Sequence, residues 1–196
     1  MFYKNVGKRA FDILISLFAL PFVVLIGIPV AVLIKLEDHG TVFYISQRYG
    51  KDMRKFGMIK FRSMKMNAKD IRNADGTTFN SSQDERQTRI GKLIRRTSVD
   101  ELPQFINVLK GDMSLIGPRP SPMGNEATYT DYVKKKFSVK PGITGYNQTL
   151  LRNRATLEER YQNDVYYAEH IGFALDFKIL MMTIVSVVRR ENIYCS

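Results

Sequence analysis

The sequence is poor in the residues that bind metals or cross-link a chain. It has a single cysteine, Cys195, and only two histidines, His39 and His170. One cysteine cannot form an internal disulfide, which is compatible with a reducing compartment. The two histidines are far apart and have no partner at the spacing of a metal site, so we interpret both as structural or surface residues. The chain also lacks a P-loop, a G-x-G-x-x-G motif and a nucleophile elbow, so none of these motifs assigns a function.

Acidic residues are scarce relative to basic ones. Thirty Lys and Arg face 19 Asp and Glu, which gives a net charge of +11. Such an excess attracts polyanions, and nucleic acid, anionic lipid headgroups and phosphorylated substrates are all candidates. Scattered basic residues could also simply keep a membrane protein soluble on its cytosolic side. The chain has no internal repeat, and its 44% hydrophobic content supports one domain with a core and a membrane segment.

The most informative feature is an uncharged apolar run, Ile13–Ile34, near the N-terminus. As a straight helix at about 1.5 Å per residue it would reach roughly 33 Å, just enough to span a bilayer. It contains Pro21 and Pro29, and a proline inside a helix removes a backbone hydrogen bond and forces a kink. The segment therefore fits a broken, re-entrant helix that turns back near Pro21 as well as it fits a span. This run favours a membrane over nucleic acid as the partner of the basic charge.

Basic residues flank the apolar run on both sides, with Lys4, Lys8 and Arg9 before it and Lys35 after it. They point to a cytosolic location for both ends. A cleaved signal peptide is the alternative, because a basic region precedes an apolar one. The run is too long for that, is interrupted by proline and has no small-x-small cleavage site.

The rest of the chain predicts a mixed α/β, helix-rich fold. Two β-branched and aromatic segments, Thr41–Ile45 and Phe56–Phe61, predict strands. A polar stretch over residues 67–83, with a turn at Asp75-Gly76, predicts a surface loop. The apolar spacing after Asp84 predicts a helix that this residue caps and that runs through Arg96.

Further helices are predicted toward the C-terminus. Glu101–Lys110 has helical spacing and ends at Gly111, a residue suited to a helix C-cap. The stretch Gly117–Pro122 contains three prolines and predicts an ordered loop. Residues 155–170 have a helical pattern, and Phe173–Val188 is apolar except for Asp176 and Lys178 and is followed by Arg189-Arg190. We expect the last segment to be an interfacial amphipathic helix.

Asp100-Glu101 is the acidic pair that could carry chemistry. One alternative is a capping box, with Ser98 as the N-cap and Glu101 reaching back to it. The other makes Asp100 the N-cap, which places Pro103 in the first turn, where its missing N–H costs nothing. Asp100 would then lie at the positive end of the helix dipole with Arg95 nearby, and both favour its ionised form. An ionised carboxylate beside a second one could attack phosphorus or hold Mg²⁺.

Three basic side chains are candidates for binding an anion. Arg119 lies between Pro118 and Pro120, which restrict the backbone and leave the guanidinium little entropy to lose on binding. A guanidinium suits bidentate contact with phosphate. Lys60 and Arg62 directly follow a predicted strand. The alternatives are a proline-rich turn with a solvent-facing arginine and an ordinary solvated strand edge.

Taken together, these residues resemble the bacterial sugar transferases, the monotopic phosphoglycosyl transferases that begin the assembly of surface glycans. The resemblance runs nearly end to end and is most specific in one block, Asp100–Pro120 (DELPQFINVLKGDMSLIGPRP). The other matching residues are Lys8-Arg9 with Asp12, Gln47-Arg48 with Gly50, Lys60–Met64, Lys140–Gly145 and Asp164–Tyr167.

The resemblance implies transfer of a sugar phosphate from a UDP-sugar to polyprenyl (undecaprenyl) phosphate, with release of UMP. It implies that Asp100 attacks the β-phosphate to form a covalent intermediate, that Glu101 completes the dyad, and that Mg²⁺ binds at both carboxylates. It further implies that Arg119, within Pro118-Arg119-Pro120, lies in the substrate pocket, and that Arg95 contacts phosphate. The reaction would be the first membrane step in making a capsule, exopolysaccharide, O-antigen or glycoprotein glycan.

The sequence departs from the family pattern in two places. The membrane segment of the family usually turns at a Ser-Pro pair midway, whereas the candidate here is Leu20-Pro21, with Pro29 as an extra break. After Gly145 the family commonly continues Leu-Ala-Gln-Val, whereas this chain has Tyr146–Thr149. The chain lacks the multi-span N-terminal extension of larger relatives and resembles the minimal catalytic form.

The resulting prediction is a membrane-embedded segment over residues 1–35 and a cytosolic catalytic domain over residues 36–196. We expect the protein at the cytoplasmic face of the inner membrane, with the UDP-sugar, polyprenyl phosphate and membrane lipids as partners, and without nucleic acid. The sequence leaves open whether the protein forms a homo-oligomer. The competing interpretation is a membrane-anchored, non-catalytic protein that binds an anionic lipid or polymer.

Overall fold

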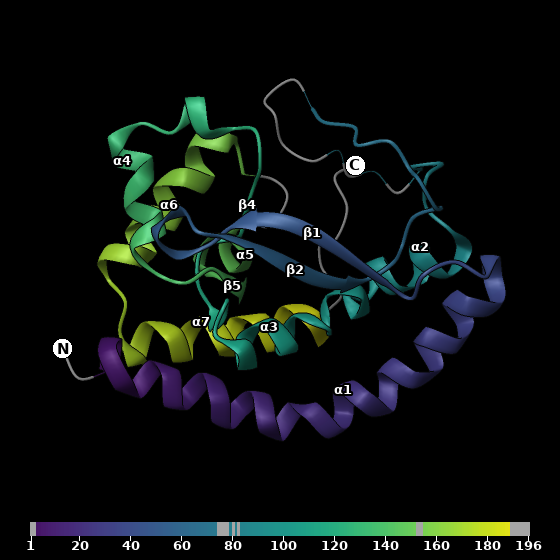
Figure 1. The fold of residues 1–196 in the computed structure, drawn as a ribbon. Coiled ribbons are helices and arrows are strands. Elements are labelled where there is room, and N and C mark those ends of the chain that lie inside the picture. Colours follow the sequence, from purple (N-terminus) through teal and green to yellow (C-terminus); the bar gives the residue numbers. More distant parts are fainter. Residues whose placement is uncertain (1–2, 74–78, 80, 82, 152–154, 189–196) are drawn as a thin grey trace.

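The computed structural model describes residues 3–188 except 74–78, 80, 82 and 152–154. The predicted turn at Asp75-Gly76 lies outside the described residues, as do Arg189-Arg190 and Cys195. The described part is a mixed α/β structure in which helices predominate, as the sequence predicts (Figure 1).

Two small sheets form the β structure. In the first, β1 (Phe43–Tyr49) pairs antiparallel with β2 (Lys55–Phe61) on one side and with β4 (Ser121–Pro122) on the other. In the second, β3 (Ser114–Ile116) pairs parallel with β5 (Gly142–Thr144). Both predicted strands are confirmed, although β1 begins later than predicted and runs on to Tyr49. The short strand β4 attaches the proline-rich stretch to the edge of the hairpin.

Helices and helical turns make up most of the remaining described chain. The α-helices are α1 (Lys8–Asp38), α2 (Arg89–Arg96), α3 (Gln104–Lys110), α4 (Asp131–Lys134), α5 (Tyr146–Leu150), α6 (Leu157–Glu169) and α7 (Phe173–Val188). Shorter turns are η1 (Tyr3–Gly7), η2 (Lys51–Met53), η3 (Val99–Glu101), η4 (Glu126–Thr128) and η5 (Lys135–Ser138). The predicted helices over 155–170 and Phe173–Val188 are therefore confirmed, and Thr156 forms a capping box with Glu159 at the start of α6.

The apolar N-terminal run forms a single helix that bends and does not break. Helix α1 is continuous from Lys8 to Asp38 and includes both Pro21 and Pro29. The predicted break near Pro21 is therefore wrong as secondary structure. A bend relieves the clash between a proline ring and the preceding turn at the loss of only one hydrogen bond. Figure 1 shows α1 curving along one edge of the molecule, with its convex side away from the body and both ends turned toward it.

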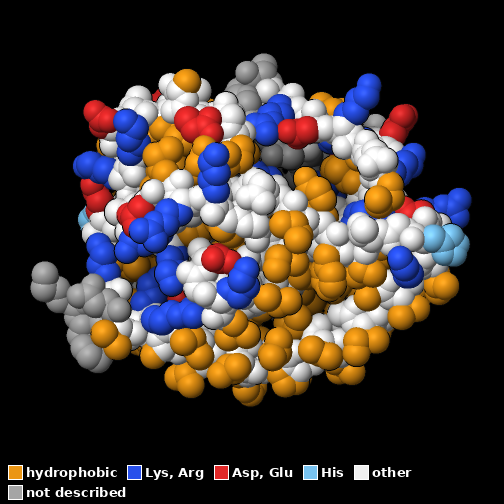
Figure 2. Space-filling view, viewed as in Figure 1, with side chains coloured by type: hydrophobic (Ala, Val, Ile, Leu, Met, Phe, Trp, Pro, Cys, Tyr) orange, Lys and Arg blue, Asp and Glu red, His pale blue; other side chains and the backbone are white. Residues whose placement is uncertain are grey.

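The convex side of α1 is apolar and exposed. In its most apolar stretch only 11% of the residues are buried, and the helix is long and apolar enough to cross a membrane. Figure 2 shows hydrophobic side chains along this edge, with Lys and Arg side chains on the body above it. Exposed large side chains on α1 include Leu14, Leu17, Phe18, Phe22, Leu25, Ile28 and Leu36. So much exposed apolar surface on a helix marks a membrane-contacting face.

The N-terminal end of α1 is held to the body by buried polar contacts. The Lys8 ammonium lies 2.7 Å from Asp176 Oδ2 on α7, and Arg9 donates to the backbone carbonyl of Val108 at 2.6 Å. Asp12 accepts hydrogen bonds from the Ser114 hydroxyl at 2.9 Å and the Leu115 amide at 3.0 Å. These contacts explain why a charged motif precedes the apolar run.

The C-terminal end of α1 is held to the same body. Arg62 forms a two-pronged ion pair with Asp38, with distances of 2.7 and 2.5 Å from its two terminal nitrogens. Glu37 accepts the backbone amides of Arg89 and Ile90, at 2.6 and 3.1 Å, and so caps the N-terminus of α2. Both ends of the apolar helix are therefore fastened to one body.

The main core lies between the hairpin, α3, β3, α6 and α7. Its buried members are Met58, Val108, Met113, Leu115, Ile116, Val139, Tyr167, Ala168 and Ile179. Buried Asn107 on α3 covers the outer edge of β2, because its side chain accepts from the Ile59 amide at 2.9 Å and donates to the Gly57 carbonyl at 2.8 Å. The amide side chain thus replaces the hydrogen bonds that a further strand would make.

Two predicted helix starts are wrong. Helix α2 begins at Arg89, not after Asp84, because the Thr88 side chain accepts the Gly91 amide while Asp84 pairs with Arg86. The helix predicted to start at Glu101 begins at Gln104, and Asp100 and Glu101 lie in the preceding turn η3. The predicted end at Gly111 is confirmed, with φ of 91° at that glycine.

Candidate active site

Three segments meet at the acidic pair. The Lys60 ammonium, near the end of β2, lies 2.6 Å from Glu101 Oε1 in η3. Arg119, in the loop before β4, places a terminal nitrogen 3.5 Å from the same oxygen. Lys60, 41 positions before Glu101, and Arg119, which follows Glu101 in the sequence, therefore converge on one carboxylate.

Asp100 lies beside this ion pair and is buried, with 9% of its surface exposed. Among the described residues, Lys60, Arg95 and Arg119 act on its carboxylate through charge without a hydrogen bond. Neither predicted capping role is present, because Ser98 makes no side-chain cap and Asp100 precedes α3 by a full turn. The Asp100 carboxylate is thus available to a ligand, whereas Glu101 is held in ion pairs with Lys60 and Arg119.

The two carboxylates have opposite pKa shifts. Burial raises the pKa of Asp100 to about 6, and the charge of Glu101 adds to this, while Lys60 opposes it. Burial also acts to raise the pKa of Glu101, but the positive charges of Lys60 and Arg119 outweigh it and lower that pKa to about 2. Adjacent carboxylates whose pKa values are pushed apart can take different roles in one reaction.

The loop Pro118-Arg119-Pro120 presents its arginine from a fixed backbone. Both prolines are buried, whereas 58% of the Arg119 side chain is exposed. Buried Asp164 on α6 accepts a hydrogen bond from the Arg119 backbone amide and pairs with the Lys136 ammonium. Asp164 therefore fixes the backbone of Arg119. In the sequence, Asp164 belongs to a segment that matches the family, but no role was predicted for it.

Three glycines allow the chain to pack closely behind this loop. A Cβ on Gly142 would lie 2.1 Å from the Gly117 amide nitrogen, and one on Gly145 would lie 2.1 Å from the Gly117 carbonyl oxygen. No side chain fits at such a distance, so the segment 140–145 packs directly against the backbone of Gly117. The hydrogen bond from the Gly142 amide to the Pro118 carbonyl, at 2.9 Å, fixes the loop in place.

The structure brings together most, but not all, of the predicted site residues. Lys60, Arg95 and Arg119 surround Asp100 and Glu101. Arg62 is buried elsewhere: besides Asp38, it donates to the carbonyls of Thr41 at 2.5 Å and Met64 at 3.0 Å. Its described contacts fasten α1 to β2, and its substrate-binding role stays a prediction.

Two partly buried side chains near the proline-rich loop contain buried polar atoms with unmet hydrogen-bonding capacity. Among the described residues, the Arg48 Nε and both amide atoms of Gln148 are buried without a hydrogen-bond partner. Sequence reasoning did not single out either side chain as functional. The available signal was that Arg48 lies in the matching Gln47-Arg48 motif. Such groups need an explanation, because an unpaired buried polar group destabilises the fold.

The acidic pair offers a minimal donor set for a metal. Within the described ranges, no group of three or more His, Cys, Asp or Glu residues gathers to hold an ion. Two carboxylates suit Mg²⁺, which typically keeps several waters and binds one or two carboxylates together with substrate phosphates. Asp100 and Glu101 therefore fit that ion if a phosphorylated ligand supplies further oxygens.

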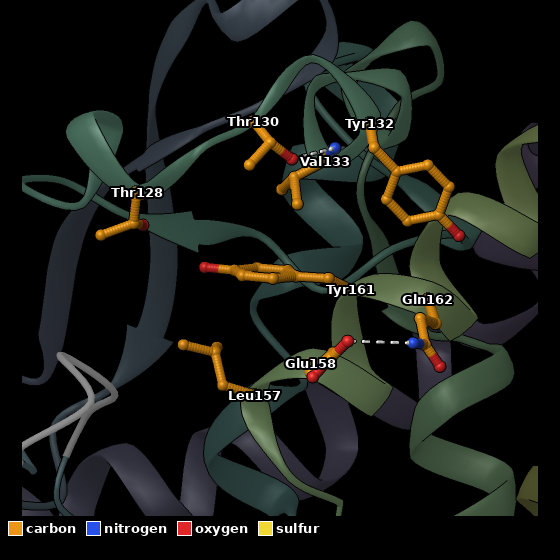
Figure 3. Close-up of a pocket in the computed structure, with 8 residues that line it drawn as sticks. All are labelled: Thr128, Thr130, Tyr132, Val133, Leu157, Glu158, Tyr161 and Gln162. Atoms are coloured by element: carbon orange, nitrogen blue, oxygen red, sulfur yellow. Dashed lines mark hydrogen bonds between the residues drawn. The ribbon is translucent and has the colours of Figure 1, made fainter.

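A pocket of about 380 Å³ lies between η4, α4 and α6 (Figure 3). The ring of Tyr161 crosses it, with Val133 on one side and Leu157 on the other. None of the predicted site residues lines it. The Lys136 ammonium, which pairs with Asp164, lies 5.4 Å from the centre of the Tyr161 ring.

A mixed α/β body with a buried acidic pair among basic side chains, attached to a long exposed apolar helix, defines a membrane-associated enzyme of anionic substrates. The sequence pattern of the bacterial sugar transferase family matches residues 3–190. The chain belongs to this family, as the sequence predicts.

Three relatives illustrate its range. The uncharacterized sugar transferase EpsL of Bacillus subtilis (strain 168) is 40% identical over 186 residues, which are 95% of this chain and 89% of that protein. The exopolysaccharide production protein PSS of Rhizobium leguminosarum bv. phaseoli is 39% identical over 194 residues, 93% of this chain and 96% of that protein.

The third relative is the UDP-N-acetylgalactosamine-undecaprenyl-phosphate N-acetylgalactosaminephosphotransferase of Aeromonas hydrophila, 39% identical over 191 residues. The match covers 92% of this chain but 43% of the Aeromonas protein. This chain therefore spans less than half of that relative's length and nearly all of the other two.

Proposed function

We propose that this protein transfers a sugar phosphate from a UDP-sugar to undecaprenyl or another polyprenyl phosphate, which gives a polyprenyl-diphosphate sugar and UMP. The observation that carries the proposal is the asymmetry of the acidic pair. Glu101 is held by Lys60 and Arg119, whereas neighbouring Asp100 is buried with a raised pKa and no hydrogen bond in the described part. The names of the Aeromonas and Rhizobium relatives support this reaction and a role in exopolysaccharide assembly.

In the first step, a carboxylate oxygen of Asp100 attacks the β-phosphorus of the donor. A new bond joins this oxygen to phosphorus, and the bond to the bridging oxygen breaks, so UMP leaves with the electron pair. A carboxylate with a pKa of about 6 is ionised at neutral pH and more basic than an ordinary aspartate, which favours attack. Glu101 holds the two cations, Lys60 and Arg119, beside the reacting phosphate.

In the second step, an oxygen of the polyprenyl phosphate attacks the same phosphorus and displaces the Asp100 carboxylate. The leaving carboxylate regains its charge, and the enzyme returns to its starting state. Arg95 and Arg119 act at Asp100 through their positive charge and are the groups that would offset the charge of two phosphates meeting there. Mg²⁺ held by Asp100 and Glu101 would supply further neutralisation of the diphosphate.

The membrane topology is part of this proposal. The segment over residues 1–35 would enter the bilayer and return to the cytoplasmic face of the inner membrane, with residues 36–196 as the catalytic domain. Support comes from the contacts at both ends of α1: Lys8 pairs with Asp176 and Asp38 pairs with Arg62, and both partners belong to one body. Attachment of both ends to one body supports a location of both ends on the same side of the bilayer. The acceptor phosphate would then meet Asp100 at the headgroup level.

Release of UMP from UDP-sugars tests the reaction. Purified protein is supplied with undecaprenyl phosphate and a panel of UDP-sugars, including the UDP-N-acetylgalactosamine named in the Aeromonas relative. We expect UMP release that depends on both substrates, stops in excess chelator and returns with Mg²⁺. Intact-mass analysis with the UDP-sugar alone should show a sugar-phosphate adduct on the wild type and none on Asp100→Asn. A protein that binds anionic lipid but releases no UMP from any donor would be the non-catalytic binder.

A further inference from the structure

Arg48 lies where the hairpin meets the proline-rich loop. In β1 it pairs across to Pro122 of β4 on one side and to Phe56 of β2 on the other. The pairing with Pro122 brings it beside the segment that follows Arg119. Its Nε is buried and, in the part of the chain that the structure describes, has no hydrogen-bond partner.

The charges around Arg48 are mostly positive. Arg119 and Arg72 both act on it, and burial together with these like charges lowers the pKa of the Arg48 guanidinium. The acids nearby are engaged by other cations: Asp70 pairs with Arg72 at 2.9 Å, and Glu101 pairs with Lys60 and Arg119. A partly buried cation with no carboxylate partner among the described residues is costly, and an anionic ligand would remove that cost.

Arg62, which directly follows β2, provides a comparison. It is more deeply buried than Arg48, but it donates to Asp38 and to two backbone carbonyls, so its hydrogen-bonding capacity is used by the fold. Arg48 shows no such set of contacts among the described residues. The hydrogen bonds of Arg62 therefore explain its role in the fold, whereas the guanidinium of Arg48 can bind a ligand.

We propose that Arg48 and Arg119 form a second phosphate subsite, which binds the α-phosphate of the nucleoside diphosphate sugar and holds the nucleoside monophosphate as it leaves. This inference rests on the proposed function for the identity of the donor. Lys60 and Arg95 flank the reacting β-phosphate at Asp100, and Arg48 extends the basic surface away from the nucleophile.

The order of the charges assigns Arg48 to the α-phosphate. Arg119 lies 3.5 Å from Glu101, the neighbour of Asp100, and three residues before Pro122, which pairs with Arg48 in the sheet. Arg119 therefore links the acidic pair to Arg48. A diphosphate with its β-phosphorus at Asp100 would extend past Arg119 and reach Arg48 with its α-phosphate. When the bond from the β-phosphorus to the bridging oxygen breaks, the new negative charge forms on the phosphate that Arg48 contacts.

The test is the affinity of the full-length protein for UMP and UDP, measured by calorimetry in detergent. For Arg48→Met we expect the Kd of both nucleotides to rise about ten- to hundredfold, by the same factor, because both contain the α-phosphate. The Kd values of Arg48→Lys should lie between those of the wild type and of Arg48→Met, since lysine keeps the positive charge but lacks the planar guanidinium. Arg54→Met, which removes an exposed arginine at the turn of the same hairpin, should bind like the wild type.

Thermal unfolding separates ligand binding from a structural role. Removing a partly buried charge that has no carboxylate partner among the described residues should leave the Tm of Arg48→Met unchanged or higher, whereas a role in the fold would lower it. If Arg48→Met does not fold, the Kd values of Arg48→Lys for UMP and UDP decide the test. A wild-type Kd for UMP in a folded Arg48 variant overturns the inference, as does a loss of affinity for UDP alone.

The two proposals fail in different ways. A wild-type protein that binds UMP through Arg48 but releases none from any UDP-sugar keeps the subsite and overturns the proposed reaction. A protein that turns over a UDP-sugar and whose Arg48→Met variant binds UMP normally keeps the reaction and overturns the subsite. Wild-type protein that binds neither UMP nor UDP overturns both.

Discussion

Asp100 is buried and, among the described residues, forms no close ion pair, and this combination sets its chemistry. In Glu101 the nearby Lys60 and Arg119 dominate and lower the pKa, whereas in Asp100 the loss of water dominates and raises it to about 6. A nucleophile must be ionised but not too weakly basic, and a pKa near 6 meets both conditions at neutral pH. The same burial makes the ionised form unfavourable for folding.

The first prediction concerns pH and adduct formation. Attack requires ionised Asp100, so the rate of adduct formation at low UDP-sugar concentration should rise with pH through about 6 and level off above it. Single-turnover experiments with the UDP-sugar alone, quenched and analysed by intact mass, measure this rate. A rate that is flat between pH 5 and 8 would show that the carboxylate titrates lower than its burial implies.

The second prediction concerns stability. The folded-state pKa of Asp100 is raised above its unfolded value, so protonation favours the fold and the penalty appears as pH rises from about 4 to about 6. At pH 7 the penalty is about 3 kcal/mol. Asp100→Asn should therefore abolish turnover, raise the Tm by several degrees at pH 7 and leave it nearly unchanged near pH 4.

Thermal unfolding of both proteins in the same detergent at the two pH values checks this. Exposed Asp131→Asn, whose carboxylate pairs with Lys134 at the surface, is the matched control and should show no gain at pH 7. A lower Tm for Asp100→Asn at pH 7 would mean that the ionised carboxylate stabilises the fold.

The third prediction concerns Arg119. Its side chain is 58% exposed and its backbone is fixed through Asp164, so substitution should leave the fold intact. Loss of a charge-assisted phosphate contact should cost roughly 1.5–3 kcal/mol. In kcat/KM this is about ten- to more than a hundredfold. Arg119→Lys should recover only part of the loss. Initial rates for these variants and for the exposed-site control Arg54→Ala decide whether Arg119 binds substrate or only forms a turn.

At the scale of elements, the active site depends on how α3 is docked. Helix α3 directly follows η3, which carries Asp100 and Glu101. Its anchor is Asn107, whose side chain bonds to the backbone of Gly57 and Ile59 on β2 and donates to Asp112 at 3.3 Å. Since β2 also carries Lys60, this contact sets the distance between the cation and the acidic pair.

The fourth prediction follows from this contact. Asn107→Leu has a similar volume but leaves two backbone groups of β2 without partners, which should destabilise the protein by about 2–4 kcal/mol. It should also lower kcat at temperatures where the protein stays folded, because the spacing of Lys60 and Glu101 is loosened. Denaturant unfolding and initial rates measure the two effects. Gln162→Leu, an exposed amide on α6, should change stability by less than about 0.5 kcal/mol.

At the scale of the whole molecule, α1 is the proposed membrane segment and is attached to the body at both of its ends. Its buried residues lie at the two ends, Lys8, Asp12 and Ser16 near one and Val30 and Ile34 near the other. The stretch between them is largely exposed and apolar. This pattern fits a helix that leaves the body at its middle, enters lipid and keeps both ends at the headgroup level.

The fifth prediction concerns topology. Lys4→Cys in a Cys195→Ser background should be protected from an impermeant thiol reagent in intact cells and labelled after permeabilisation. Lys134→Cys on the exposed surface of α4 should behave in the same way, because it belongs to the proposed cytosolic domain. Labelling of Lys4→Cys alone in intact cells would show that α1 spans the bilayer and would end the re-entrant proposal.

The sequence by itself determined the elements that depend on neighbouring residues. The apolar run, the hairpin strands, the helix end at Gly111 and the whole of α7 follow from hydrophobic periodicity and local backbone preferences, which act over a few residues. The family could also be predicted, because the block from Asp100 to Pro120 has a distinctive order of residues.

Tertiary structure alone decided how those residues are used. Helix α2 starts later than predicted because Thr88, and not Asp84, caps it. Helix α3 starts later than predicted because Asp100 and Glu101 form the separate turn η3, in which Glu101 pairs with Lys60. Arg48 lies in β1 and Arg62 directly follows β2, yet in the described part of the chain only Arg62 pairs with a carboxylate from α1. Charge, burial and hydrogen bonding depend on partners that are distant in sequence. The pKa of Asp100 and the buried Nε of Arg48, which has no partner in that part, therefore arise only once the chain has packed.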